Sequence, residues 1–214
     1  MKLILWQKGV GNIKVKNNMP KADKEKHLAL VKEQWVQLKE PKSIGSAILI
    51  SVPIMILNAI ITVSIINIVS PISLKEFGLS ENSFSINING FQILGIFLTL
   101  IIHEFIHLIF IPNFIKSDET FIGLTPFGGY VYSEEVIAKS RYILITIAPF
   151  IVISIILPLI LGVLGLLSPS MKFLILLNSM GASVDILNLI NVLFQVPSSS
   201  NLTSCGMNTY WKKI

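Results

Sequence analysis

Two histidines and a glutamate stand close together in the apolar stretch from Leu100 to Leu108. His103 and His107 are four residues apart, and Glu104 directly follows the first of them. On an α-helix this spacing puts the two imidazoles one turn apart on the same face, where they can share a metal ion. Glu104 is then offset around the helix and can act as general base toward a metal-bound water. The pattern predicts a zinc site that activates water for hydrolysis.

The rarity of titratable groups in the apolar stretches favours this interpretation. The chain has three histidines, and two of them belong to this pentapeptide; the third, His27, lies in a charged segment where we expect it to be solvated. A charged group inside a bilayer costs several kcal/mol unless it is paired or ligated, so it marks a functional site. The alternative is a pair of histidines that form hydrogen bonds between helices without a metal.

A catalytic zinc ion needs a third protein ligand and an open fourth position. The other acidic residue in an apolar stretch is Asp185. At a rise of about 1.5 Å per residue, its depth in the membrane is compatible with that of the two histidines. We therefore predict that Asp185 completes the zinc site. Asn178, one of the polar residues at helical spacing around it, is predicted to bind substrate or to hold the Asp185 carboxylate, with interhelical hydrogen bonding as the alternative.

A glycine-containing loop follows the histidine motif. Residues 126–131 read Pro-Phe-Gly-Gly-Tyr-Val, and proline and paired glycines favour a turn or an extended chain over a helix. A protease must hold its substrate in an extended form, and an exposed strand edge can do so by adding the substrate as a further strand. We expect Gly128 and Gly129 to shape such a substrate-binding segment. An ordinary loop turn is the alternative.

The elements that position these residues belong to a membrane protein. Of the 214 residues, 52% are hydrophobic and 14% are charged, whereas a soluble domain carries about 25% charged residues. Four apolar stretches reach the roughly 20 residues needed to cross a bilayer, namely residues 44–69, 91–111, 142–164 and 171–196. The predicted fold is all-α and polytopic, with four transmembrane helices and a short irregular or β-like loop after the second.

The distribution of lysine and arginine predicts the orientation of the spans. With both termini in the cytoplasm, fifteen basic residues lie inside and two lie outside, and the opposite orientation reverses that count. We expect a multi-pass protein of the cell membrane with a cytoplasmic segment 1–43, a four-span domain 44–196 and a cytoplasmic tail 197–214. The catalytic core is expected within residues 91–196. The lysines are not interleaved with an aromatic stacking platform, which argues against a nucleic-acid partner.

The two cytoplasmic segments carry weaker patterns. Residues from Asp23 to Lys39 have the spacing of a short amphipathic helix that Pro41 ends, and we expect this helix to lie on the inner leaflet. A regulatory role for this helix is the alternative. Residues 197–208 are rich in Ser and Asn and are expected to be irregular. Cys205 is alone, so no disulfide can form within one chain.

The order of these features resembles the site-2 protease clan of intramembrane zinc proteases. Members of that clan combine a His-Glu-x-x-His helix, a loop with a Pro-apolar-Gly-Gly-aromatic-Val segment, a second helix, and a helix with a metal-binding Asp. The matching residues here are His103, Glu104, His107, the segment 126–131 and Asp185. The chain is also similar to small bacterial membrane proteins described as putative zincin peptidases.

The resemblance implies a Zn²⁺-dependent peptidase of a bacterial cell membrane, with a membrane protein or peptide as substrate. One departure concerns the last helix, where the clan places Asn-x-x-Pro before Leu-Asp-Gly. This chain has Asn-Ser-Met-Gly at 178–181 and Val-Asp-Ile at 184–186, so a proline kink is not expected. Two other functions remain open. A catalytically silent zinc-binding scaffold would need a fourth protein ligand, and a cation transporter would need several polar sites along a path.

Overall fold

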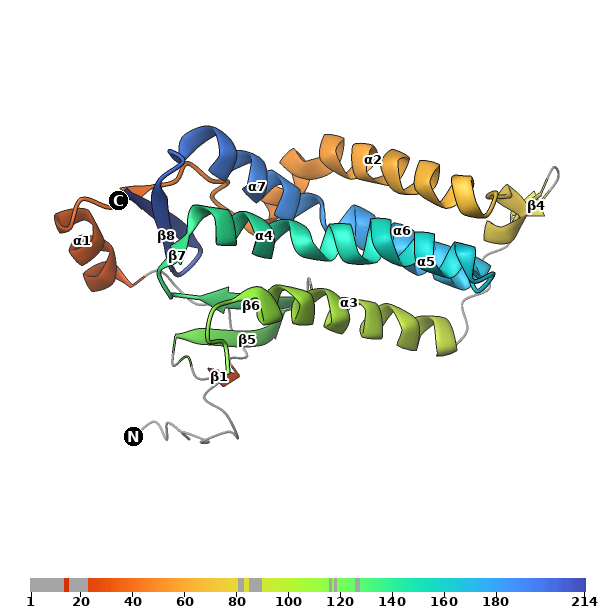
Figure 1. Cartoon of the computed structure of the whole chain (residues 1–214), viewed down its shortest axis with the longest axis horizontal. Coiled ribbons are helices and arrows are strands. Elements are labelled where there is room, and N and C mark those ends of the chain that lie inside the picture. Colours follow the sequence, from red (N-terminus) through yellow and green to blue (C-terminus); the bar gives the residue numbers. More distant parts are fainter. Residues whose placement is uncertain are drawn as a thin grey trace.

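The structure is a computed structural model that describes residues 14–15, 23–80, 83–84, 90–115, 117, 119–125 and 128–214. The chain is mostly helical, and two of its small sheets lie at the end of the helical bundle where the C-terminus lies (Figure 1). Within the described residues, four helical segments are long and apolar enough to cross a membrane: Ile44–Val69, Gln92–Phe110, Lys139–Val163 and Pro169–Gln195. The number of helical segments that could span a membrane equals the predicted number, and their bounds agree with the prediction within a few residues.

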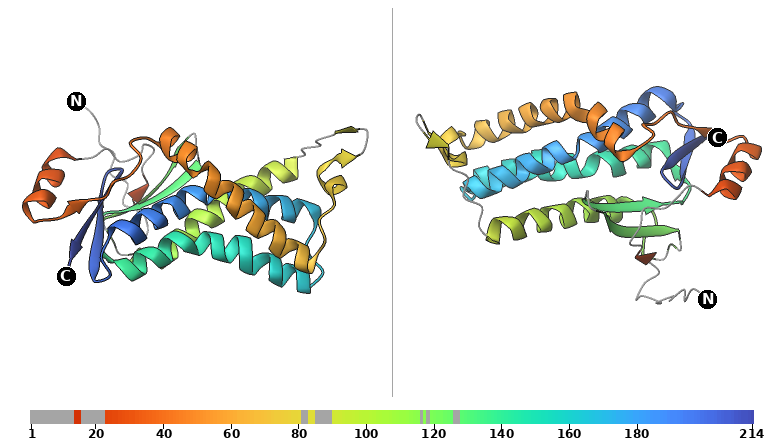
Figure 2. Two further views of the ribbon diagram at one scale, coloured as in Figure 1. Left: turned by 90° about the horizontal axis from the view of Figure 1, so that it is seen from above. Right: turned by 180° about the vertical axis from the view of Figure 1, so that it is seen from behind.

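The first two spans are single helices. Helix α2 (Ile44–Val69) begins with a capping box, in which the Ser43 side chain accepts from the backbone N–H of Ser46 and the Ser46 side chain accepts from the backbone N–H of Ser43. Helix α3 (Gly90–Phe110) carries the histidine motif. The two helices lie on opposite sides of the other spans (Figures 1 and 2).

The third span changes its helical geometry twice. Helix α4 (Lys139–Pro149) continues into the π-helical segment η2 (Phe150–Ile156) and then into helix α5 (Leu157–Val163). A proline has no backbone N–H, so Pro149 and Pro158 each remove one backbone hydrogen bond from this span. The widened turns are therefore a direct consequence of the sequence.

The fourth span is interrupted as well, although no proline is present there. Helix α6 (Pro169–Gly181) and helix α7 (Ser183–Gln195) are separated by Ala182, whose ψ angle is 0°. This break replaces the continuous helix expected for residues 171–196, and it lies three residues before Asp185. Ala182 has no exposed surface, and its small side chain lets the chain change direction here among closely packed helices.

The loop after α3 forms a β-hairpin, where a short irregular or β-like loop was predicted. Strand β5 (Thr120–Thr125) pairs antiparallel with strand β6 (Gly128–Ser133), and strand β1 (Lys14–Val15) pairs parallel with β5. The order is β1-β5-β6, so β6 is an edge strand of this sheet as far as it is described. Pro126 and Phe127, part of the predicted substrate-binding segment, lie outside the described residues.

The C-terminal tail is folded, and the prediction that residues 197–208 are irregular was wrong. Strands β8 (Ser200–Cys205) and β9 (Asn208–Lys213) form an antiparallel hairpin that turns at Gly206, whose φ is +61°. Strands β2 (Val36–Gln37) and β7 (Ile137–Ala138) complete a sheet of order β2-β9-β8-β7. Pairing with distant segments gives this Ser/Asn-rich stretch an ordered ladder that its own composition does not predict.

The N-terminal amphipathic segment contains one short helix and one two-residue strand. Helix α1 (Lys24–Lys32) is capped by the Asp23 carboxylate and ends at Glu33, and the chain then turns at Gln34 with a φ of +66°. The prediction of one helix from Asp23 to Lys39 was therefore wrong, because residues 36–37 pair with β9 instead. Its location on the inner leaflet stays a prediction.

Two side chains of the tail hairpin hold α1 in place. The apolar side of the helix packs through Leu30 onto Cys205 and Tyr210.

At the far end of the molecule lie the short helix η1 (Leu74–Phe77) and the strands β3 (Leu79–Ser80) and β4 (Ser83–Phe84).

Candidate metal centre

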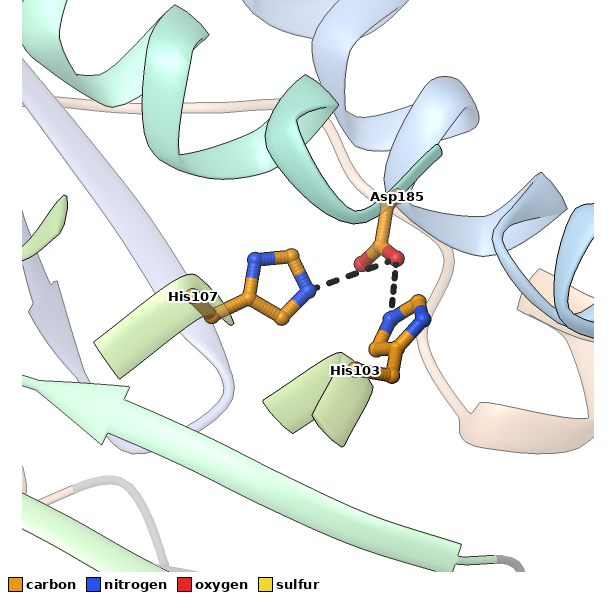
Figure 3. Close-up of side chains that lie close together, drawn as sticks. All are labelled: His103, His107 and Asp185. Carbon is orange, nitrogen blue, oxygen red and sulfur yellow. Dashed lines mark hydrogen bonds and ion pairs between the residues drawn. The ribbon is translucent and has the colours of Figure 1, made fainter. Parts of the chain in front are cut away.

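The side chains of His103, His107 and Asp185 converge between α3 and α7 (Figure 3). The Oδ2 atom of Asp185 lies 3.1 Å from Nε2 of His103 and 3.5 Å from Nε2 of His107. One ligand atom from each residue lies within 4.8 Å of those of the other two. No other cluster of three or more His, Cys, Asp or Glu ligands occurs in the part of the chain that the structure describes. The folded chain thus brings the three predicted metal ligands together.

Helix packing positions the two histidines of α3 and Asp185 of α7 relative to each other. The last turn of α3 is tied to the start of α4, because Nε of Arg141 donates to the backbone carbonyl of Phe110. Ile106, on the same helix as the histidines, is buried against Ala148 and Ile153 of the third span. Asp185 lies in the first turn of α7, directly after the break at Ala182. The break therefore sets where the carboxylate meets the two imidazoles.

The remaining ring nitrogen of each histidine faces an oxygen that can only accept. Nδ1 of His103 lies 2.9 Å from Oδ1 of Asn178, and Nδ1 of His107 lies 2.8 Å from the backbone carbonyl of Ile145. Each Nδ1 therefore carries a proton and donates it. In a neutral imidazole this leaves the lone pair on Nε2, directed toward Asp185.

The Ile145 carbonyl is available because of a proline. In a regular α-helix this carbonyl would accept from the N–H four residues later, which is residue 149. Pro149 has no N–H to donate, so the carbonyl is left for His107. A buried carbonyl without a partner would be costly in a membrane, and the imidazole removes that cost.

The donor set fits a zinc ion. Two neutral Nε2 lone pairs and a carboxylate oxygen are all acceptors, so their close approach needs a cation or extra protons between them. Zinc with three such protein ligands is the arrangement of catalytic sites, and atoms about 2.0–2.1 Å from a tetrahedral zinc are about 3.3 Å apart. The measured separations of 3.1 and 3.5 Å lie on either side of that value. Zinc-binding histidines usually also donate their other ring N–H to an acceptor, which fixes the imidazole tautomer. His103 and His107 both do so, to Asn178 and to the Ile145 carbonyl.

Glu104 lies between the cluster and strand β6. Its carboxyl group interacts electrostatically with His103, His107 and Asp185, and it accepts a hydrogen bond from the backbone of Val131. A Cβ atom added at Gly129 would lie 2.7 Å from Cγ of Glu104. The close approach of strand and glutamate therefore requires glycine at position 129.

Gly128 begins strand β6, where it pairs with Thr125 at the end of the hairpin. Like Gly129, it was predicted to bind substrate, and for both residues this role stays a prediction. The structure adds their position: the edge strand that contains them runs beside α3 at the level of Glu104.

Asn178 is buried, with 5% of its surface exposed, and both ends of its amide are engaged. Its Oδ1 accepts from His103, and its Nδ2 donates to Oγ of Ser154 at 2.9 Å. The structure gives Asn178 a contact with a metal ligand, and the predicted substrate contact stays a prediction. Sequence reasoning missed Ser154, although a lone serine between apolar residues of the third span could have indicated a buried polar contact.

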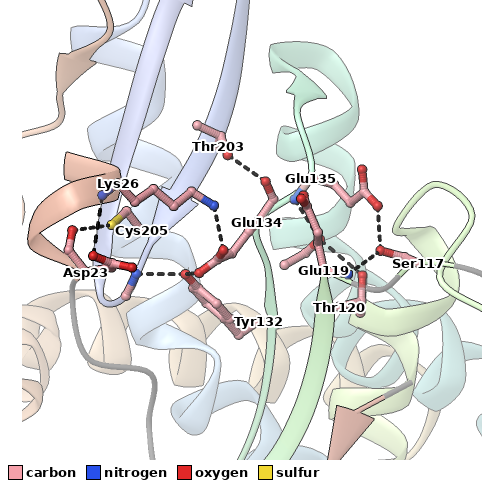
Figure 4. A network of polar contacts seen from close by, with 12 residues as sticks. Asp23, Lys26, Ser117, Glu119, Thr120, Tyr132, Glu134, Glu135, Thr203 and Cys205 are labelled. Atoms are coloured by element: carbon pink, nitrogen blue, oxygen red, sulfur yellow. Dashed lines mark hydrogen bonds and ion pairs between the residues drawn. The ribbon is translucent and has the colours of Figure 1, made fainter. Parts of the chain in front are cut away.

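The far end of β6 is anchored to the N-terminal helix and the tail hairpin (Figure 4). The hydroxyl of Tyr132 donates to Oε1 of Glu134 at 2.6 Å and accepts from the backbone N–H of Gly206 at 2.7 Å. Burial raises the pKa of Tyr132, and the neighbouring Glu134 raises it further, so the hydroxyl keeps its proton. Lys26 of α1 pairs with the same Glu134. The N-terminal helix and the tail hairpin together fix the strand that touches Glu104.

Comparison with known proteins yields one match. Residues 96–201 match the family model described as putative zincin peptidase. No curated protein and no solved structure matches the chain. Zincins are zinc-dependent peptidases with a His-Glu-x-x-His helix, and the geometry described above agrees with that description. Over residues 96–201, which contain His103, Glu104, His107 and Asp185, this chain belongs to the family of putative zincin peptidases.

Proposed function

We propose that this protein is a membrane-embedded zinc metallopeptidase of the site-2 protease type, which hydrolyses peptide bonds in or next to the membrane. The observation that carries the proposal is the convergence of His103, His107 and Asp185 beside Glu104, with both outer imidazole nitrogens bonded to acceptors. A site of this kind in a chain with four apolar spans has a membrane protein or membrane peptide as its natural substrate.

His103, His107 and Asp185 would hold zinc. When bound, zinc supplies a Lewis acid that polarises the peptide carbonyl and lowers the pKa of the attacking water. Glu104 takes a proton from that water on a carboxylate oxygen as the oxygen attacks the carbonyl carbon. It then gives the proton to the amine nitrogen as the C–N bond breaks. The hydrogen bond from Val131 orients the carboxylate for both transfers.

Strand β6 offers a surface for an extended substrate. Because the N–H of Val131 is directed to Glu104, it points away from β5, and alternation along a strand gives Gly129 and Ser133 the same direction. A substrate segment paired with this edge would run beside the glutamate and the zinc ligands. Main-chain pairing of this kind is tolerant of side chains, so affinity would come from the backbone and selectivity from nearby pockets.

The proposed location is a bacterial cell membrane, with both termini in the cytoplasm and the metal centre toward the cytoplasmic side. The excess of lysine in residues 1–43 supports this orientation. The β5–β6 hairpin and the tail sheet lie at the same end of the bundle, so a substrate would reach strand β6 from that side (Figures 1 and 2).

The decisive experiment compares purified wild type, Glu104→Gln and Asp185→Asn. Zinc content is measured by elemental analysis, and cleavage is measured on a library of membrane peptides. We expect wild type to bind zinc and cleave, Glu104→Gln to keep zinc and lose turnover by about 10²–10⁴-fold, and Asp185→Asn to lose both. Wild type without zinc, or full cleavage by Glu104→Gln, would overturn the proposal. Zinc without any cleavage would instead indicate the catalytically silent scaffold.

A further inference from the structure

One face of the first span is polar and completely buried. Ser51 and Thr62 of α2 have no exposed surface, and Asn58 is 3% exposed, whereas most other residues of this helix lie on the outside of the bundle. The three residues follow each other at intervals of seven and four, which puts them on one side of a helix. Helix α2 lies outside the matched residues 96–201, so the family comparison assigns it no role.

Each of these side chains forms a hydrogen bond with the interrupted fourth span. Nδ2 of Asn58 donates to the backbone carbonyl of Ser179 at 3.1 Å, and Oγ1 of Thr62 donates to Oγ of the same serine at 2.8 Å. Further along, Oγ of Ser183 donates to Oγ of Ser51 at 3.2 Å. The two serines of the fourth span lie on either side of the break at Ala182, so α2 holds both ends of it.

The break also carries two residues of the metal centre. Asn178, which orients His103, directly precedes Ser179, and Asp185 follows Ser183 by two residues. A backbone carbonyl beside a helix break has no water to bond in the hydrocarbon region, so a side-chain donor from a neighbouring helix must supply the hydrogen bond. Asn58 supplies it at Ser179. Any shift of this turn would move the Asp185 carboxylate and the Asn178 amide together.

We propose that Asn58 and Thr62 are positioning residues of the metal centre, which act through Ser179 to set Asp185 and Asn178 relative to the imidazoles. The first span is then a working part of the zinc site and more than a membrane anchor. This inference rests on the proposed function only in that the cluster binds a metal.

The test measures metal affinity instead of turnover. Zinc affinity is obtained by competition with a chelator, and the ligand geometry is read from the visible absorption spectrum of the Co²⁺-loaded protein. We expect Asn58→Leu and Thr62→Val each to weaken zinc binding by about tenfold and to change the Co²⁺ spectrum. Thr62→Ser keeps the hydroxyl and should restore wild-type affinity. Ser64→Ala is the matched control, because Ser64 is an exposed residue of α2 that bonds only within its own helix among the contacts that the structure describes.

A double-mutant cycle keeps the test informative if Asn58→Leu is too unstable to purify. Thr62→Val and Ser179→Ala remove the two partners of one hydroxyl pair, so the double variant should lose no more affinity than either single variant. Additive losses, or unchanged affinity and Co²⁺ spectra in Thr62→Val, would overturn the inference while zinc binding by wild type still supports the proposed function. Absence of zinc from wild type would refute both.

Discussion

Oδ1 of Asn178 lies 2.9 Å from Nδ1 of His103, and the opposite end of the same amide donates to Ser154. Because the amide oxygen can only accept, Nδ1 of His103 must carry the proton, and Nε2 is left free for a metal. A residue 75 positions away thus selects the tautomer of a metal ligand.

Replacing Asn178 should weaken metal binding. Asn178→Leu removes the acceptor for Nδ1 of His103, and we expect zinc affinity to fall about 10–100-fold, as it does when outer-shell partners are lost. Chelator competition measures the change. Asn178→Asp keeps an acceptor and is the conservative comparison. Wild-type zinc affinity combined with weaker substrate binding in Asn178→Leu would instead support the substrate-binding role predicted from the sequence.

A methyl group at position 129 should separate chemistry from metal binding. In Gly129→Ala the new Cβ would meet Cγ of Glu104 at 2.7 Å, so the strand or the carboxylate must move. Misplacement of a catalytic group by about 1 Å can cost about 10²-fold in rate, and we expect a loss of that order with zinc content unchanged. Gly45→Ala is the matched control, because Gly45 is an exposed residue in the first turn of α2 and nothing lies within 4 Å of a Cβ built there. Equal turnover in the two variants would contradict the proposed role of the strand.

Removing the Tyr132 hydroxyl should loosen the contact between β6 and the tail. Tyr132→Phe keeps the ring, which stacks on Phe121 with centroids 5.9 Å apart, but it leaves Glu134 and the Gly206 N–H without this partner. We expect the free energy of unfolding to fall by about 1–3 kcal/mol. Unfolding in detergent solution measures the loss, and zinc content should stay at the wild-type level. A variant as stable as wild type would show that the hydroxyl contacts contribute nothing.

The buried carboxyl group of Glu40 should make the stability of the folded protein depend on pH. Burial raises the pKa of its carboxyl above the ordinary value of 4.5, even though the backbone N–H and the hydroxyl of Thr209 both donate to it. Above pH 4.5 the folded state therefore binds more protons at this group than the unfolded state does. The stabilising contribution is fully present below that pH and is lost as the pH rises through the raised pKa.

The Glu40→Gln variant isolates this contribution. Thermal unfolding of both proteins from about pH 4 to about pH 8 should show that wild type loses stability relative to the variant as the pH rises. Parallel curves for the two proteins would mean that the pKa of Glu40 is the same in the folded and unfolded states.

Local properties of the sequence were enough to predict the four apolar helical segments and the residues that converge at the candidate metal centre. The length of an apolar run determines whether it can cross a bilayer, and helix α2 has the predicted bounds, Ile44–Val69. The spacing of His103 and His107 puts both rings on one face of any helix that contains them. The choice of Asp185 as candidate third ligand rested on the scarcity of acidic residues in the spans and on its depth relative to the two histidines.

The tertiary structure decided everything that depends on pairing between distant segments. The tail hairpin Ser200–Lys213 exists because β2 and β7 complete its sheet, and no local pattern in a Ser/Asn-rich stretch indicates such partners. The break at Ala182 likewise depends on which helices lie side by side. The same holds for the hydrogen bond from His107 to the Ile145 carbonyl and for that from Asn58 to Ser179. A sequence specifies which polar groups need partners in the membrane, but only the packed bundle determines which partner each one meets.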